Sequence, residues 1–380
     1  MKRLKPRVMN KERMIENFIE MVKIHSPSKF ELPLGEYLIT KLKNLGFEIY
    51  LDHGYKNYGG NCPTIFGKLS GNIEGEGITL VAHMDVIEPN KDVIVKIEDN
   101  IIKTDGNCTL GGDDKAGIAS ILEALTVITE NNYNHEDIFV VFTPGEEIGM
   151  AGAKSIDWSL VPDHIKPAKN MIVVDNAGKA GIIAHSAPSK YNFKIEFLGR
   201  KAHAGIEPEK GINSIVLAGE FLSKAPLLRI DSLTTANIGF IESNFPTNVV
   251  PDYCYLTGEV RGHSEEKIKE ILNLYSEILE NTKSIRGGDF IFTYECDFPT
   301  LKPVDNLKFA KDFEEVYKAL GIETELKVIG GGSDSNIFAK EGYNSIIIGV
   351  GMENVHTVEE SLDTRELIKT TEAIIKYIKK

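Results

Sequence analysis

Short apolar runs that alternate with helical patterns are the feature that most constrains the fold of this chain. Helical apolar spacing separates the runs, as in residues 118–129 (IASILEALTVIT). The runs predicted as strands are ITLVAH (78–83), IFVVFT (138–143), MIVVD (171–175) and NSIIIGV (344–350). Strands connected through helices form parallel sheets covered on both faces, so we predict an α/β fold with a mostly parallel sheet.

The middle of the chain has a different pattern. Between residues 187 and 297, longer segments of alternating polar and apolar residues indicate antiparallel strands with one solvated face, interleaved with two helical stretches. A chain of 380 residues also exceeds the usual size of a single hydrophobic core. We therefore predict a first α/β part over residues 1–186, an inserted α+β domain over 187–297, and a second α/β part over 298–380.

Composition limits the partners and the location of the protein. The formal net charge is −13, and the acidic residues are spread along the chain, which argues against nucleic acid and anionic membranes as partners. The N-terminal residues are basic but lack the apolar core of a signal peptide. No run approaches the roughly 20 apolar residues of a membrane span. We expect a cytoplasmic protein that binds neither nucleic acid nor membrane.

Acidic and histidine side chains gather where the predicted strands end, or in the loops that follow. In open α/β sheets, the carboxyl ends of the strands are the edge where ligands bind. The segments that carry these side chains are ITLVAHMD, TLGGDDKAG, VVFTPGEEIG, MIVVDNAG and GVGMENVHTVEES. The collected residues are His83, Asp85, Asp113, Asp114, Glu146, Glu147, Asp175 and His356.

So many carboxylates in one place require a cation, because like charges a few ångströms apart repel each other. Imidazole and carboxylate groups are suitable ligands for zinc, manganese and cobalt. The set is larger than one ion needs, so two ions bridged by one carboxylate, roughly 3.5–4 Å apart as in hydrolytic enzymes, are the economical interpretation.

Each motif also has a simpler explanation. His83 and Asp85 could form a hydrogen-bonded pair in the core, and the DD pair could cap a helix. The GEE triplet could begin a surface helix, Asp175 could end a strand, and His356 could be an ordinary loop residue. A single site explains all five coincidences together, so we favour it.

These motifs, in this order, resemble those of the zinc-dependent exopeptidase and amidohydrolase family that includes peptidase T, carboxypeptidase G and aminoacylase. The resemblance covers nearly the whole chain, and GGDDKAG and GGSDSNIF are most similar to its peptidase T-like branch. It implies that Asp113 bridges two metal ions. The remaining implied ligands are His83 and Asp175 at one ion, and Glu147 and His356 at the other.

The resemblance also implies catalytic roles. Glu146 would be the general base, and Asp85 would accept a hydrogen bond from His83 and fix its tautomer. His203, in KAHAGIEPEKGINS, would reach the active site of a partner subunit and stabilise an oxyanion. The inserted domain, 187–297, would then be a lid and the surface of a homodimer.

Substrate contacts are expected from several further residues. Asn248 and Arg261 match family positions that hold the substrate carbonyl or carboxylate, although Arg261 could instead form a salt bridge on a strand surface. The glycine-rich loop with Gly331, Gly332 and Ser333 could cradle the peptide backbone. For Lys115, contact with substrate and neutralisation of the acidic cluster remain alternatives.

The predicted function is hydrolysis of short peptides from the N-terminus, as in a tripeptide aminopeptidase, with two divalent ions and water activated by Glu146. Zinc is the expected metal, with cobalt and manganese as alternatives. The competing prediction is an N-acyl amino acid deacylase with the same two-metal site. A metal-binding scaffold and a dinuclear phosphoesterase agree less well with the residues present.

Overall fold

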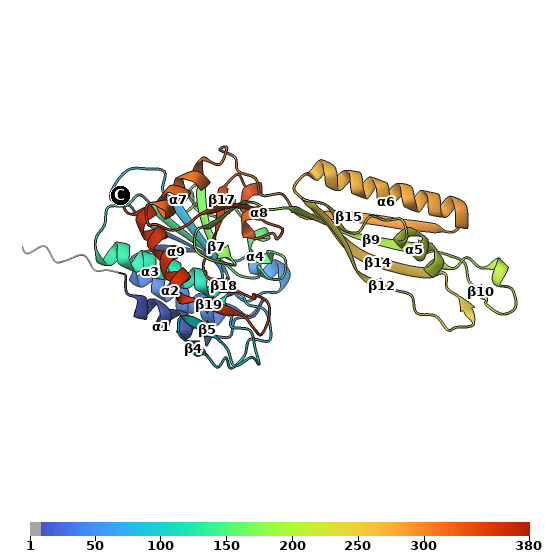
Figure 1. The fold of residues 1–380 in the computed structure, drawn as a ribbon, viewed down its shortest axis with the longest axis horizontal. Helices are drawn as coiled ribbons and strands as arrows, with labels where there is room; N and C mark the ends of the chain where they lie inside the picture. Colours follow the sequence, from blue (N-terminus) through green and yellow to red (C-terminus); the bar gives the residue numbers. More distant parts are fainter. Residues whose placement is uncertain (1–8) are drawn as a thin grey trace, which may run out of the picture. The chain divides into compact units, whose positions relative to one another are not determined.

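The computed structural model describes residues 9–380, so the basic start of the N-terminus lies outside the described residues. The described residues form two compact units (Figure 1). The first, which we call the α/β unit, extends to Ser186 and also contains Lys302–Ile329 and Ser333–Lys380. The second, the inserted unit, contains Ala187–Leu301 and Gly330–Gly332.

A large mixed sheet forms the centre of the α/β unit, with the strand order β1-β2-β6-β3-β7-β17-β8-β16. Its central strands β6, β3, β7 and β17 are mutually parallel. The strands are β1 Glu48–Asp52, β2 Thr64–Leu69, β3 Ile78–His83, β6 Ile138–Thr143, β7 Asn170–Asn176, β8 Ile182–Ser186, β16 Glu325–Val328 and β17 Asn344–Gly349. Every residue of β3, β6 and β17 is buried, which explains why their sequences are mostly apolar.

Helices flank this sheet (Figure 1). They are α1 Lys11–Val22, α2 Leu32–Asn44, α3 Gly112–Glu130, α4 Ala151–Lys154, α7 Lys308–Lys318, α8 Asp334–Lys340 and α9 Thr364–Ile378. Helix α3 packs against β3, β7, α1 and α9, and most of its residues are buried. At Gly117 a Cβ atom would lie 2.1 Å from the carbonyl oxygen of Val174, so only glycine allows α3 to approach β7 this closely.

A small second sheet holds the C-terminal loop in place. It joins β4 Lys96–Glu98 and β5 Ile101–Lys103 to β19 Ser361–Asp363 and β18 Met352–Glu353. The loop that contains His356 connects β18 to β19, which pair antiparallel. The short strands of this sheet were not predicted, because two or three residues are too few to show a periodic pattern.

The inserted unit is an α+β structure. Its antiparallel sheet has the order β11-β12-β14-β9-β15, and helices α5 Ser214–Leu222 and α6 Glu265–Arg286 pack against it (Figure 1). The strands are β9 Ser189–Leu198, β11 Leu228–Asp231, β12 Thr234–Glu242, β14 Tyr253–Gly262 and β15 Asp289–Phe298. Sequence patterns did not indicate β15. A two-residue ribbon pairs β10 Ala202–His203 with β13 Val249–Val250.

None of the helices among residues 9–380 has the length and apolar character needed to cross a membrane.

Candidate metal centre

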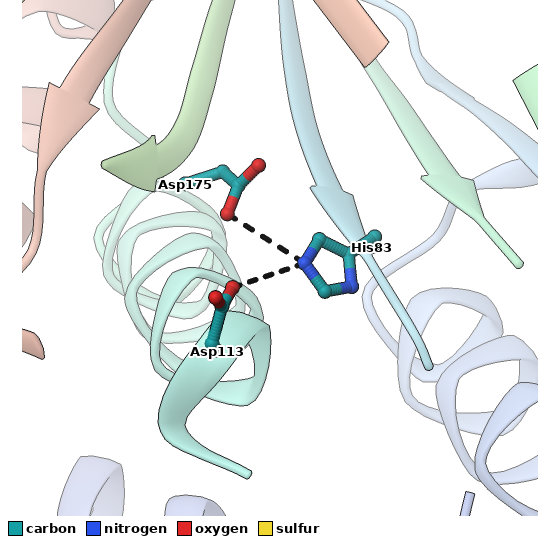
Figure 2. Close-up of side chains that lie close together, drawn as sticks. All are labelled: His83, Asp113 and Asp175. Carbon is teal, nitrogen blue, oxygen red and sulfur yellow. Dashed lines mark hydrogen bonds and ion pairs between the residues drawn. The ribbon is translucent and has the colours of Figure 1, made fainter. Parts of the chain in front are cut away.

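The first group of candidate ligands joins two strand ends to the start of a helix (Figure 2). His83 ends β3, Asp175 lies near the end of β7, and Asp113 lies in the first turn of α3. The His83 Nε2 atom lies 3.0 Å from Asp113 Oδ1 and 3.6 Å from Asp175 Oδ1. The His83 side chain is only 2% exposed, so these three groups converge inside the protein.

The second group shares Asp113 with the first. His356 Nε2 lies 3.2 Å from Asp113 Oδ2 and 3.0 Å from Glu147 Oε1. The two oxygens of Asp113 therefore face different histidines, one in each group. In each group, the candidate donor atoms lie within 4.8 Å of one another. All five predicted ligands are thus brought together, in the two groups that the resemblance implied.

The donor atoms fit a pair of cations. His83 Nδ1 lies 2.9 Å from the backbone carbonyl oxygen of Asp85, and because a carbonyl can only accept, Nδ1 carries the proton. In the neutral ring, Nε2 then presents its lone pair to Asp113 and Asp175, which is the tautomer of a metal ligand. The buried Glu147 Oε1 atom lies 3.0 Å from His356 Nε2. Such an oxygen is suited to a cation.

The pKa shifts of these groups show how strongly they interact. Burial raises the pKa of Asp175 to about 7. Burial opposes a charged His83, but the Asp175 carboxylate and the hydrogen bond to Asp113 raise its pKa well above the ordinary value. Hydrogen bonds to Asp113 and Glu147 raise the pKa of His356 to about 10. In the absence of a cation, protons on these groups have to offset the concentrated negative charge.

Asp85 has partners that the sequence did not reveal. The Nδ1–H of His83 donates to the Asp85 backbone carbonyl at 2.9 Å, and Asp85 Oδ1 lies 3.4 Å from the same nitrogen. The carboxylate also accepts hydrogen bonds from the backbone N–H groups of Glu146 at 2.9 Å and Glu147 at 3.0 Å, and from the Ser28 hydroxyl at 2.7 Å. Asp85 therefore fixes the turn that carries both glutamates.

Glu146 is the carboxylate of this turn that belongs to neither ligand group. Burial raises its pKa well above the ordinary value, and the Asp175 and Asp334 carboxylates contribute in the same direction. Asp334, which was not predicted, begins α8, and its Oδ2 accepts a hydrogen bond from the Thr143 hydroxyl. A raised pKa is expected for a carboxylate that must take up a proton near neutral pH.

Buried charged residues that are not candidate ligands form hydrogen bonds with the backbone at and near the centre. Glu360 is 1% exposed, and its carboxylate accepts hydrogen bonds from the backbone N–H groups of Gly111 at 2.7 Å and Asp113 at 2.9 Å. The motif HTVEES contains it, but sequence alone does not separate Glu360 from its neighbour. Asp114 Oδ2 accepts the backbone N–H of His83 at 3.2 Å. The fully buried Lys115 donates to the Ile24 carbonyl at 2.8 Å, a structural contact.

The predicted residues of the inserted unit form no comparable cluster. His203 and Asn248 are exposed neighbours, since the Ala204 N–H donates to the Asn248 carbonyl beside the β10–β13 pair. The Arg261 guanidinium bonds to Glu259, with Nε 2.7 Å from Oε1, which is the salt bridge considered as the alternative.

The glycine-rich loop also has a structural role at its end. Ser333 is 5% exposed and forms a capping box with Asn336 at the start of α8. Gly331 is exposed and Gly332 is half-buried. The Ser333 side chain is thus occupied by the helix, and the exposed backbone before it is the part open to a ligand.

Comparisons with known proteins agree with this geometry. Residues 79–380 match the model of the family described as peptidase family M20/M25/M40. The uncharacterized protein YqjE of Bacillus subtilis is 34% identical, over 98% of this chain and 99% of the relative.

Two crystal structures are also similar. Aminopeptidase PepT of Bacillus cereus has a TM-score of 0.91 and 34% identity, over 97% of this chain and 98% of that chain. A tripeptidase of Staphylococcus aureus has a TM-score of 0.92 and 32% identity, with the same coverage. These matches confirm the predicted α/β fold and the resemblance to the peptidase T-like branch.

Proposed function

This chain belongs to peptidase family M20/M25/M40, as a peptidase T-like metallopeptidase, and from that premise we propose that it is a two-metal aminopeptidase acting on short peptides. The observation that carries the proposal is the sharing of Asp113 between the two ligand groups. One carboxylate that faces two histidines, with each group completed by a further acid, is the donor arrangement expected for a bridged pair of divalent ions.

The ligands divide between the two ions. His83 and Asp175 would hold one, Glu147 and His356 the other, and Asp113 both. When bound, such a pair acts as a Lewis acid and activates water for attack on a carbonyl. We propose zinc as the resident metal, because histidine and carboxylate donors without cysteine suit an open zinc site; cobalt and manganese are compatible with the same donors.

Glu146 would move the proton in this reaction. Its backbone N–H bonds to Asp85, so the position of its main chain is fixed by a buried acceptor. As a general base, it would take the proton of the attacking water and then deliver it to the leaving amine. Glu146 belongs to neither ligand group, so its carboxyl group is available to hold that proton between the two steps.

His203 would stabilise the oxyanion in the active site of a partner subunit, with the inserted unit forming the homodimer surface. His203 Nδ1 accepts a hydrogen bond from the Gly205 N–H at 3.2 Å, which places the proton of the neutral ring on Nε2. An exposed Nε2–H is a suitable donor to an oxyanion. Its neighbour Asn248 would hold the substrate carbonyl.

The substrate would be a short peptide with a free N-terminus. Both similar crystal structures are of peptidases, one described as an aminopeptidase and the other as a tripeptidase. An N-acyl amino acid deacylase would use the same metals and the same base, so the substrate's amino end distinguishes the two functions.

The test compares three substrates with one enzyme preparation: a tripeptide, the same tripeptide with an acetylated N-terminus, and an N-acetyl amino acid. Chelator-stripped protein is assayed before and after addition of zinc, cobalt or manganese, with Glu146→Ala as the inactive control. We expect metal-restored cleavage of the free tripeptide alone. Cleavage of only the acetylated amino acid would assign the protein to the deacylases, and metal-independent cleavage would contradict the mechanism.

A further inference from the structure

Glu360 makes the longest-range polar contact to the candidate metal centre without belonging to either ligand group. It is the last residue of the loop that contains His356 and is almost completely buried, yet its partners are 247 and 249 residues away in sequence. Each of its carboxylate oxygens accepts one backbone N–H, from Asp113 and Gly111 respectively.

These N–H groups belong to the first turn of α3, where a helix leaves backbone donors without internal partners. Gly111 is the N-cap residue and has no side chain to satisfy them. The turn is not regular helix, because Asp113 has φ −79° and ψ 104°. Glu360 therefore supplies the acceptors that hold an irregular turn, and this turn sets the direction of the Asp113 carboxylate.

The glycines of the same turn leave room for the Glu360 carboxylate. Gly111 has φ +69°, a conformation that favours glycine. A Cβ atom on Gly112 would lie 3.1 Å from Glu360 Oε1, so any side chain there would press on the carboxylate. The segment GGDD and the second glutamate of VEES thus fit each other as one unit.

We propose that Glu360 is a positioning residue for the bridging carboxylate of Asp113, and therefore for both metal positions at once. This inference rests on the proposed two-metal function. A ligand such as His356 serves one ion, so its loss affects one position. Glu360 acts on the backbone of the shared ligand, so its loss displaces a donor of both ions together.

A purely structural role for Glu360, as a cap that stabilises α3, gives a different expectation. Loss of a helix cap lowers the free energy of unfolding but leaves the metal affinities of the folded protein unchanged. The number and affinity of bound metals therefore separate the two roles without reference to catalytic activity.

The experiment is a cobalt(II) titration of chelator-stripped protein, followed by the visible spectrum and by metal analysis after equilibrium dialysis. Wild type is compared with Glu360→Ala, with Glu359→Ala as a matched exposed control, and with His356→Ala as a single-position comparator. Groups that orient metal ligands typically contribute 10–100-fold in affinity. We expect both binding steps to weaken by about 10-fold or more in Glu360→Ala, only one in His356→Ala, and neither in Glu359→Ala.

Two milder variants keep the test decisive if Glu360→Ala does not fold. Glu360→Gln retains one acceptor oxygen, and Gly112→Ala keeps the carboxylate but displaces it. We expect both variants to lower the metal affinity of both binding steps, by a smaller factor than Glu360→Ala. Wild type that binds fewer than two ions would refute the proposed function. Wild type that binds two ions, with unchanged affinities in the folded Glu360 variants or weakening of one step only, would overturn the positioning role.

Discussion

Buried carboxylates in and near the candidate metal centre differ from a carboxylate on the sheet of the inserted unit in the direction of their pKa shifts. Burial in the α/β unit raises the pKa of Glu31 and of Asp175 to about 7 each. In the inserted unit, a hydrogen bond from Lys194 lowers the pKa of the partly exposed Glu196. The buried acids at the candidate metal centre lie close together despite their mutual repulsion, whereas Glu196 is paired with a nearby lysine. Only the first arrangement calls for a metal ion.

The predicted functional residues of the two units also differ in their contacts. In the α/β unit, they contact one another through two groups that share Asp113. In the inserted unit, Arg261 is bonded to Glu259, and His203 is an exposed residue of a short ribbon. The clustered acids and histidines of the candidate metal centre therefore belong to the α/β unit alone among the predicted residues.

The largest effect should come from removing the shared ligand. Asp113→Ala deletes a donor from both groups, so we expect loss of both metals and a fall in tripeptide kcat/KM of at least about 10⁴-fold. Metal analysis and steady-state kinetics check this. An Asp113→Ala protein that retains two tightly bound ions would contradict the assignment of Asp113 as the ligand that both metal positions share.

Glu146→Gln should separate proton transfer from metal binding. The amide keeps the size of the side chain but cannot accept the proton, so we expect kcat to fall by about 10²–10⁴-fold. Metal content should be unchanged, because Glu146 belongs to neither ligand group. Loss of metal in this variant would instead show that it is a ligand.

His203→Ala should have a smaller effect. We expect kcat to fall by about 10²–10³-fold relative to wild type, as for loss of one oxyanion donor. Metal affinity should not change. Mixing this variant with Glu146→Gln tests whether His203 acts across a dimer. A mixed dimer would then contain one intact site and regain activity, whereas no recovery in confirmed mixed dimers would place His203 in its own subunit's reaction or outside it.

Metal-free protein should lose stability as the pH rises from about 4.5 to about 7. Burial raises the pKa of Glu31 and Glu360 from an ordinary 4.5 to about 7, so the folded state holds protons that the unfolded state releases in this range. Their contribution is complete below pH 4.5 and is lost as the pH passes 7. Melting temperatures of chelator-stripped protein measure it.

Glu31→Gln should flatten this profile, because an amide does not titrate. The matched control is Glu196→Gln in the inserted unit, whose lowered pKa places its effect below pH 4.5. A wild-type melting temperature that rises between pH 4.5 and 7 would contradict the prediction.

The smallest effect is expected at Arg261. Because its guanidinium is already bonded to Glu259, on a partly exposed strand surface, we expect Arg261→Ala to raise KM by no more than about 3-fold and to leave stability nearly unchanged. A much larger rise in KM, reduced for substrates without a free carboxylate, would restore its predicted role in substrate binding.

Long apolar runs made the central fold predictable. The bounds predicted for β3 and β6 coincide with those observed, because a fully buried strand has a mostly apolar sequence with a polar residue at its end. Strand β15 and the small sheet next to the His356 loop were missed. Exposed or very short strands gain their stability from neighbouring strands, and that contribution has no local signature.

Local sequence patterns establish which side chains are available, and they predict His83, Glu147 and Asp175 at strand ends that share one edge of the sheet. These features are local, because burial dictates apolar strands and strand ends dictate where polar residues can lie. Which atoms face each other depends on how distant segments pack in the folded chain. The two oxygens of Asp113 face different histidines, and the Asp85 carboxylate turns to backbone N–H groups.

Selection of Glu360 rather than Glu359 as the partner of Gly111 was likewise decided by the fold. Adjacent glutamates are equivalent in sequence, and the direction of each depends on the path of the chain between β18 and β19. Contacts that span about 250 residues arise from packing, which no local pattern encodes.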